Sequence, residues 1–350
     1  MPDFDIENGV LRKYTGNKPH VVIPEEITQI GENAFIKCSS MVSIVIPEGV
    51  TKIGNSAFWG CSNLSSVTLP QSLREIGDRA FESCASLTSI IIPAGITRIG
   101  YRTFLKCINL ASVTVPDGVT DIDDSAFCGC ASLASVTLPG SLRLIGPTAF
   151  AGCEKLTSAI IPDGVTHIGK SAFKNCKSLT SLVLPDSVTS VMDFAFYECE
   201  SLASVTVSAR MAEIRASVFD HCTGLTSIII PEGVARIGEC AFDSCKSLTS
   251  VSLPRSIVEI GNSIMKLSPF LDPVKETFVN HILPAIQNIW DKATKIVKSI
   301  IDFVAQCEIL RDWWDGIVWV VGRVWESISD GMNRLLWIWE HILGTYRPYS

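Results

Sequence analysis

The residues of this 350-residue chain with the most specific chemistry are its thirteen cysteines, since thiolates bind zinc, form disulfides and carry out redox exchange. Ten of them follow one another at an interval of 23 residues: Cys38, Cys61, Cys84, Cys107, Cys130, Cys153, Cys176, Cys199, Cys222 and Cys245. A zinc site needs four converging ligands, usually from short spacings such as C-x2-C, but each interval supplies one cysteine. Gly129 alone separates the one tight pair, Cys128 and Cys130. The spacing therefore predicts no metal site and no redox centre.

Other catalytic constellations are missing from the sequence as well. The five histidines lie at 20, 167, 221, 281 and 341, too far apart to suggest a triad, and none accompanies a G-x-S-x-G motif. The densest carboxylate group, Asp117, Asp121, Asp123 and Asp124, lacks the closing Glu of a calcium loop. We therefore predict no catalytic residue, no cofactor, no metal and no small-molecule substrate, and the chain is not expected to be an enzyme.

The elements that position the cysteines share their period. Proline recurs every 23 residues from Pro24 to Pro254, with Ser208 in one place, and phenylalanine recurs from Phe35 to Phe242. The alternation in LTSIIIP, 87–93, predicts a half-buried strand, and GITRIG, 95–100, predicts a second short extended piece. Phe and Cys three residues apart share a helix face, so the x-x-A-F-x-x-C segment is expected to form a helical turn. One such unit cannot bury its own apolar side, and a stack of about eleven makes a solenoid.

In such a stack the repeated cysteine has a simple structural role. It is expected to be a small apolar plug where neighbouring repeats approach too closely for leucine. Disulfides between neighbouring repeats stay an alternative, since strand spacing is within bridging range, but nothing selects one pairing register. Inert thiols of this kind suit a reducing compartment.

The recurring elements IP-x-G-V-T-x-I-G, AF and C-x-S-L-T-S resemble the BspA-like leucine-rich repeat family over about residues 22–265. The resemblance implies a curved, β-rich array, often found on surface proteins that act in adhesion or partner binding. It implies no shared catalytic constellation. The predicted fold class is α+β, a leucine-rich-repeat solenoid of 23-residue repeats followed by a small all-α C-terminal region.

Two rows of side chains are expected to face outward from the predicted strands. One row is serine in every repeat, from Ser43 to Ser250. The other is β-branched or small, and its members are the candidate interaction surface: Thr68, Ile91, Thr114, Thr137, Ile160, Val183, Thr206 and Ile229. An ordinary strand surface without a ligand explains the same composition. Charges of both signs alternate on the neighbouring turns, which indicates solubility and pairing between neighbours.

The 23-residue period stops near residue 266. The predicted domains are an N-terminal cap, 1–21, the repeat solenoid, 22–265, and a Trp-rich amphipathic helical region, 266–350. The candidate partner or membrane contacts in the last region are its tryptophans: Trp290, Trp313, Trp314, Trp319, Trp325, Trp337 and Trp339. Tryptophan followed by an acidic residue is similar, over short stretches, to amphipathic helices of phage tape-measure proteins.

Three explanations of this region stay open. Its helices cap the solenoid or form a partner-binding bundle, lie in a membrane interface, or drive oligomerisation. The region lacks a basic face that would attract anionic lipid.

Composition limits the partners and the location. The net charge of −7 argues against nucleic-acid binding. No signal peptide is visible at the N-terminus, which together with the reduced thiols favours the cytoplasm, whereas the family resemblance favours the cell surface or secretion. The sequence thus predicts a non-enzymatic binding or adhesion scaffold that takes a protein or cell-surface ligand through its repeats. The alternative prediction is a membrane-associated effector that acts through residues 266–350.

Overall fold

The computed structural model describes residues 3–254, 256–257 and 259–260, and farther along residues 291–292, 295 and 298–299. The chain falls into two compact units, Met1–Ile264 and Met265–Ser350, and the first contains all the strands. The predicted all-α region lies outside the described residues apart from five exposed ones in helical conformation, and its seven tryptophans lie outside them entirely. The bounds 1–21, 22–265 and 266–350 stay predictions.

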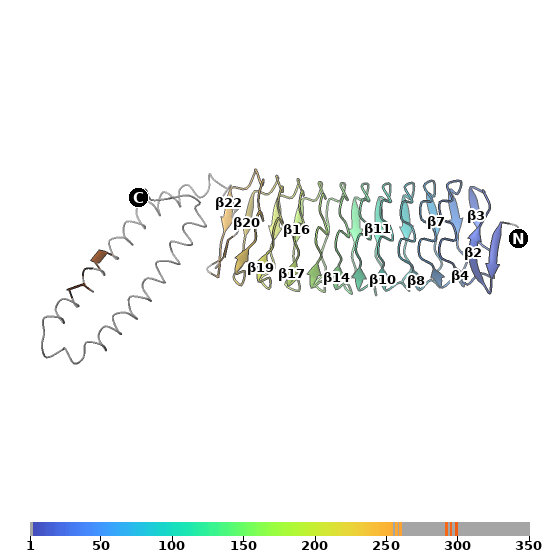
Figure 1. Cartoon of the computed structure of the whole chain (residues 1–350), viewed down its shortest axis with the longest axis horizontal. Coiled ribbons are helices and arrows are strands. Elements are labelled where there is room, and N and C mark those ends of the chain that lie inside the picture. The colour runs from blue at the N-terminus through green and yellow to red at the C-terminus, as the bar shows by residue number, and fades with distance from the viewer. Residues whose placement is uncertain are drawn as a thin grey trace, which may run out of the picture. The chain divides into compact units, whose positions relative to one another are not determined.

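Two series of parallel strands run along the array, each called a sheet here, with one strand of each series from nearly every 23-residue repeat, or rung (Figure 1). The pairing in each series divides into three runs of hydrogen-bonded strands. The serine sheet is named for the serine that opens most of its strands: β3 (His20–Val22), β5 (Ser43–Val45), β7 (Ser66–Thr68), β9 (Ser89–Ile91), β11 (Ser112–Thr114), β13 (Ser135–Thr137), β16 (Ser181–Val183), β18 (Ser204–Thr206), β20 (Ser227–Ile229) and β22 (Ser250–Ser252).

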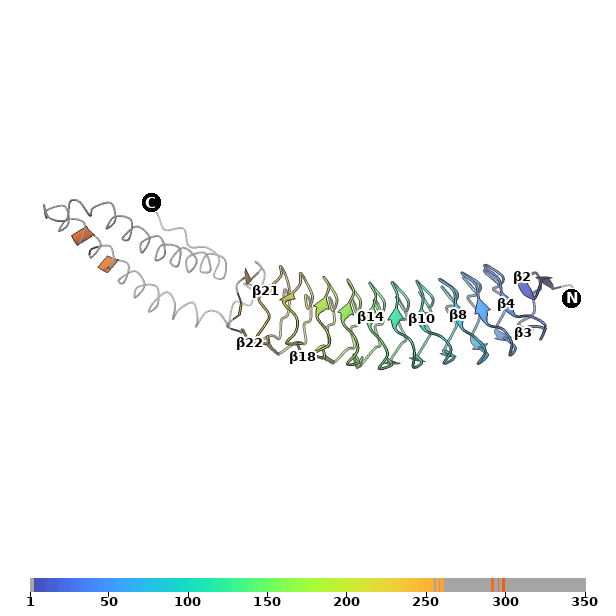
Figure 2. The same cartoon turned by 90° about the horizontal axis from the view of Figure 1, so that it is seen from below.

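The second sheet, the short-strand sheet, has two residues from each rung. Its strands are β4 (Gln29–Ile30), β6 (Lys52–Ile53), β8 (Glu75–Ile76), β10 (Arg98–Ile99), β12 (Asp121–Ile122), β14 (Leu144–Ile145), β15 (His167–Ile168), β17 (Ser190–Val191), β19 (Glu213–Ile214), β21 (Arg236–Ile237) and β23 (Glu259–Ile260). Figure 2 shows the rungs of this array stacked along one axis. The predicted solenoid of 23-residue repeats is confirmed.

The pairing register equals the repeat length. In the serine sheet Ser112 pairs with Ser135, and in the short-strand sheet Ile99 pairs with Ile122. The rung between β13 and β16 has no full strand in the serine sheet. It is connected to its two neighbours by single β-bridges, from Ser158 to Ser135 and from Ser158 to Ser181. Because every residue faces its own equivalent in the next rung, each column of the array carries one kind of side chain.

An antiparallel hairpin precedes the first rung. It consists of β1 (Phe4–Glu7) and β2 (Val10–Tyr14), and β2 continues the short-strand sheet beside β4. Tyr14 packs its ring 5.3 Å from that of Phe35 and covers the first end of the core. The hairpin therefore caps the apolar interior at the N-terminal end of the array.

The segment that carries the core phenylalanine is not helical, and the predicted helical turn is wrong. In each rung two residues four positions apart have left-handed backbone, such as Ser56 at φ 53° and Gly60 at φ 71°. As a result, some backbone N–H groups of this segment bond within their own rung and others bond to the next rung. Cys61 donates within its own rung to the carbonyl of Phe58, at 3.2 Å, whereas Phe58 donates to the next rung, to the carbonyl of Ala80 at 2.8 Å.

The core is a stack of these phenylalanines. Rings from Phe35 to Phe242 lie with neighbouring centroids 5.0 to 5.7 Å apart and nearly parallel planes. All ten rings are fully buried or nearly so. Stacked rings of this kind contribute beyond their buried area, so the column holds successive rungs together along the axis of the array.

Candidate interaction surfaces

The cysteine column is buried and bonded. From Cys61 to Cys245 each thiol donates a hydrogen bond to the backbone carbonyl oxygen of the phenylalanine in the preceding rung, with Sγ···O distances of 3.0 to 3.4 Å. None of the ten cysteines of this column forms a disulfide. The prediction of buried structural thiols is confirmed, while their role as hydrogen-bond donors was missed.

Burial also fixes the protonation of these thiols. It raises the pKa of Cys61, Cys107 and Cys245 to about 12, and that of Cys130 well above its ordinary value. Thiolate is the form that attacks disulfides and binds metals. The column is therefore unreactive near neutral pH.

The outer face of the serine sheet is an exposed surface of uniform composition. In most strands an inward residue lies between two exposed ones, as buried Ile90 lies between Ser89 and Ile91. The eight predicted contact residues, Thr68, Ile91, Thr114, Thr137, Ile160, Val183, Thr206 and Ile229, all lie exposed in one column, here called the outer row. Ile91 and Ile160 are 81% and 83% exposed. Their part in binding stays a prediction.

Hydroxyl groups beside this face bond between rungs. Thr157 donates to the carbonyl of Ala134, and Thr180 donates to the carbonyl of Thr157, both at 3.3 Å. Ser65 bonds in the same way to Val42 at 3.1 Å. These hydroxyls precede the strand serines, and their fixed spacing of 23 is the sequence signal that identifies them.

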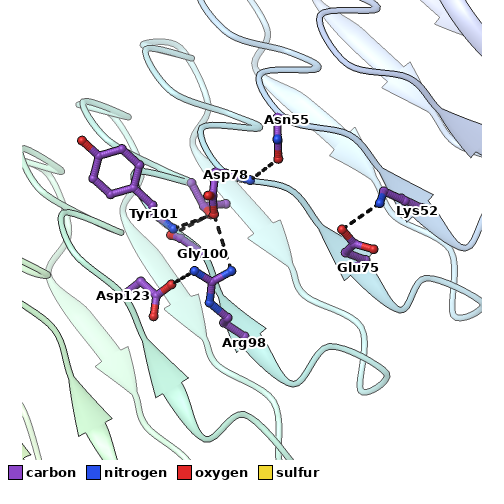
Figure 3. Close-up of polar contacts among 9 residues, drawn as sticks. Lys52, Asn55, Glu75, Asp78, Arg98, Gly100, Tyr101 and Asp123 are labelled. Atoms are coloured by element: carbon purple, nitrogen blue, oxygen red, sulfur yellow. Dashed lines mark hydrogen bonds and ion pairs between the residues drawn. The ribbon is translucent and has the colours of Figure 1, made fainter.

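The short-strand sheet carries charges that pair along the array. Lys52 Nζ lies 3.0 Å from Glu75 Oε1 in the next rung, as Figure 3 shows. Farther along, Arg236 pairs with Glu213 of the preceding rung at 3.2 Å. The predicted pairing between neighbours is thus confirmed, and these charges are already satisfied within the chain.

Arg98 is held more closely than the other cations of this sheet. Its guanidinium lies 3.6 Å from Asp78 and pairs with Asp123 of the next rung (Figure 3). Asp78 in turn accepts the backbone N–H of Tyr101 at 3.0 Å, and its own N–H donates to Asn55 at 3.0 Å. An open depression of about 400 Å³ lies over Arg98 and Asp78, but their mutual pairing leaves little charge there for a ligand.

The described residues also bear on metal binding and on membrane insertion. Among them, no three His, Cys, Asp or Glu side chains lie so as to hold a metal ion. Within the same residues no helix has the length and apolar character needed to cross a bilayer.

The parallel strands, the 23-residue register and the phenylalanine stack define the chain as a β-solenoid repeat protein. The family model described as the BspA type leucine rich repeat region, in six copies, matches residues 6–134, 97–225 and 143–272. The chain belongs to this family. No curated protein matches it.

Solved structures similar to the chain come from several bacteria. A leucine rich cell surface protein from Faecalibacterium prausnitzii is 30% identical and covers 77% of this chain and 91% of its own, with a TM-score of 0.45. A leucine-rich repeat protein from Bacteroides ovatus is 25% identical, covers 77% and 90%, and has a TM-score of 0.48. One from Eubacterium ventriosum is 21% identical, covers 73% and 87%, and has a TM-score of 0.47.

Proposed function

We propose that the chain is a non-enzymatic, protein-binding scaffold that binds its partner with the outer face of the serine sheet. The supporting observation is the outer row, because β-branched side chains there are held exposed in one column across the array. Ile229 and Val183 are 70% and 60% exposed, and the equivalent side chains of Ile91 and Ile160 are exposed even more. Apolar side chains at fixed spacing on a rigid surface bury area on binding at little entropic cost.

The other long face suits this role less well. The charges of the short-strand sheet pair with one another, as in Lys52 and Glu75, so a partner would have to compete with contacts inside the chain. The outer row lacks such internal partners for its aliphatic groups, which favours it as the binding surface.

Site-specific photo-crosslinking tests this proposal. A photoreactive amino acid at Ile91 or Ile160 is expected to yield the same crosslinked protein from cells that express the full chain, and the matched position Leu144 on the short-strand sheet is expected to yield none. Ile160→Lys in the Ile91-labelled chain should remove the product. A crosslink from Leu144 alone, or one unaffected by Ile160→Lys, would place binding elsewhere.

We further propose that the chain acts at the cell surface in adhesion. The Faecalibacterium relative is a cell surface protein, which supports this location. The thiols do not oppose it, because their burial and protonation protect them from oxidation in an open environment as well. Protease treatment of intact cells should release array fragments, and complete resistance with the chain recovered from lysed cells would refute surface display.

The alternative of a membrane-associated effector concerns residues 266–350 and stays a prediction. Liposome flotation of the full chain measures it directly. Co-flotation that is lost on Trp→Ala substitution at Trp337 and Trp339 would support the alternative, and absence from the lipid fraction would remove it.

A further inference from the structure

The two sheets of the array begin differently at the N-terminal end. The short-strand sheet continues past β4 into the hairpin strands β2 and β1. The serine sheet begins at β3, which in the described part of the chain has a single sheet neighbour, β5 (Figure 1). The hairpin thus supplies the short-strand half of a preceding rung and leaves the serine-sheet half vacant.

The backbone groups at this edge can be assigned from the bonds that β3 makes. Pro19 accepts an N–H from Ser43 at 3.0 Å, and Ile23 donates to Val45 at 3.2 Å, so these residues face β5. Successive residues of a strand direct their backbone groups to opposite sides. The N–H and C=O groups of His20 and Val22 therefore point away from the array.

We propose that this edge, the β3 edge formed by the outward backbone groups of His20 and Val22, is a docking site for an extended polypeptide segment of a protein partner. The segment adds to the serine sheet as a parallel strand. An unpaired strand edge is a ready template for such an addition.

The kind of segment that would bind at the β3 edge follows from the strand pairing between successive rungs. Each rung docks on the next by parallel pairing of a three-residue strand, and the incoming segment continues that interface by one strand. Val21 is only 3% exposed, since the hairpin already covers the end of the core, so recognition at the edge relies on backbone hydrogen bonds. Val22, 69% exposed, offers an apolar contact for the first outward side chain of the segment.

The proposal is independent of the outer-face proposal, because it concerns the end of the serine sheet and not its face. A substitution that blocks the edge leaves Ile91 and Ile160 unchanged. The two surfaces are therefore tested by different variants, and failure of one says nothing about the other.

The test uses a peptide with the array's own strand sequence, LTSIIIP from 87–93, carrying a fluorophore and two added lysines for solubility. Fluorescence anisotropy is expected to show saturable binding to the full chain. Val22→Pro removes one outward N–H and leaves the bonds to β5 in place, and it should weaken binding at least tenfold. Val45→Lys, at the position that pairs with Val22 one strand farther in, is the matched control and should bind like the unchanged chain.

Hydrogen exchange gives a second readout that does not depend on a variant. Peptide at saturation should protect the amides of His20 and Val22 and leave the exposed turn amides unaffected. Absent binding, equal binding by Val22→Pro, or unchanged exchange at both amides would overturn the proposal. Self-association of the chain that Val22→Pro abolishes, without peptide binding, would also overturn it by assigning the edge to a second copy.

Discussion

The thiol of Cys107 donates a hydrogen bond to the backbone carbonyl oxygen of Phe81 in the preceding rung, at a distance of 3.1 Å. The same oxygen accepts the backbone N–H of Cys84, also at 3.1 Å. Cys107 is fully buried, so no water competes for this acceptor. The cysteine column therefore links successive rungs in addition to filling the space between them.

Substitution of this cysteine separates its two roles. Cys107→Ala removes both the donor and the packing of the sulfur, and we expect it to lower the free energy of unfolding by about 2 kcal/mol. Cys107→Ser keeps a donor and should cost about 1 kcal/mol, chiefly for burying a more polar group. Urea denaturation followed by circular dichroism measures both. If the alanine variant is as stable as the unchanged chain, the hydrogen bond to Phe81 contributes nothing.

The same thiols predict that the array loses stability at alkaline pH. Burial raises the pKa of Cys107 to about 12 in the folded chain, whereas an unfolded cysteine titrates near ~8.5. Between these values the unfolded chain releases a proton that the folded chain retains. The free energy of unfolding should therefore fall by about 1.4 kcal/mol per pH unit for each such thiol.

Urea denaturation at pH 8, 9 and 10 under reducing conditions checks this dependence. Cys107→Ser lacks one titrating thiol, and its stability should decline less steeply with pH than that of the unchanged chain. Cys38→Ser is the control, because Cys38 is only half-buried and its thiol keeps more of its contact with water in the folded chain. Parallel pH profiles for the Cys107 variant and the unchanged chain would contradict the assignment.

The strands were predictable from sequence because their signal is local. The alternation around Ser89, Ile90 and Ile91 needs only the two-residue period of a strand, and the 23-residue repeat then fixes the register. The exposed outer row follows from the same alternation. The repeat solenoid and the exposure of the outer row were therefore both predictable from the sequence.

The turn segment was not predictable in the same way. Phe58 and Cys61 are three apart, a spacing that fits a helical turn and the observed turn equally well. Left-handed backbone at Arg79 (φ 58°) opposes the preference of a non-glycine residue, and it is held by hydrogen bonds to the next rung, such as Arg79 N–H to Tyr101 at 2.8 Å. Hydrogen bonds between rungs thus override the backbone preference of the individual residue. The sequence of a single rung gives no signal for these bonds.

Of the charge pairs on the short-strand sheet, some were predictable from the sequence and others were not. Mixed charges predicted that Lys52 would pair with a neighbour, and the partner is its column equivalent Glu75. Arg98 pairs with Asp78 and Asp123, which occupy other columns of the repeat than Arg98 does. A comparison of equivalent positions in successive repeats does not reveal such pairs. Side-chain direction decides such contacts, and repeat spacing alone does not determine it.

Gly77 and Gly140 lie outside the strands, at corners of their rungs, and give a prediction about rung spacing. A Cβ on Gly77 would lie 2.6 Å from the backbone nitrogen of Asn55, whereas one on Gly140 would meet nothing within 4 Å. We expect Gly77→Ala to destabilise the array by about 2 kcal/mol through this clash. Gly140→Ala should be neutral or stabilise by about 0.5 kcal/mol, because alanine restricts the unfolded chain. Thermal unfolding of the pair tests this, and equal melting temperatures would show that the rungs separate freely at the corner.

The last prediction concerns Arg98 and the carboxylate of Asp123. Burial raises the pKa of Asp123, and the guanidinium of Arg98 opposes that rise. In Arg98→Ala the pKa of Asp123 should climb further, so the folded chain prefers a protonated Asp123 more strongly than the unfolded chain does. Stability at pH 7 should fall by about 1 kcal/mol, and part of the loss should return at acidic pH as the carboxyl of Asp123 takes up a proton.

Lys52→Ala provides the comparison for this variant. Lys52 and Glu75 are both exposed, so loss of their pair should cost less than about 0.5 kcal/mol at either pH. Urea denaturation of both variants at pH 7 and pH 4.5 separates the two cases. A loss in Arg98→Ala that is equal at both pH values would mean that Arg98 stabilises the array by packing and not by neutralising Asp123.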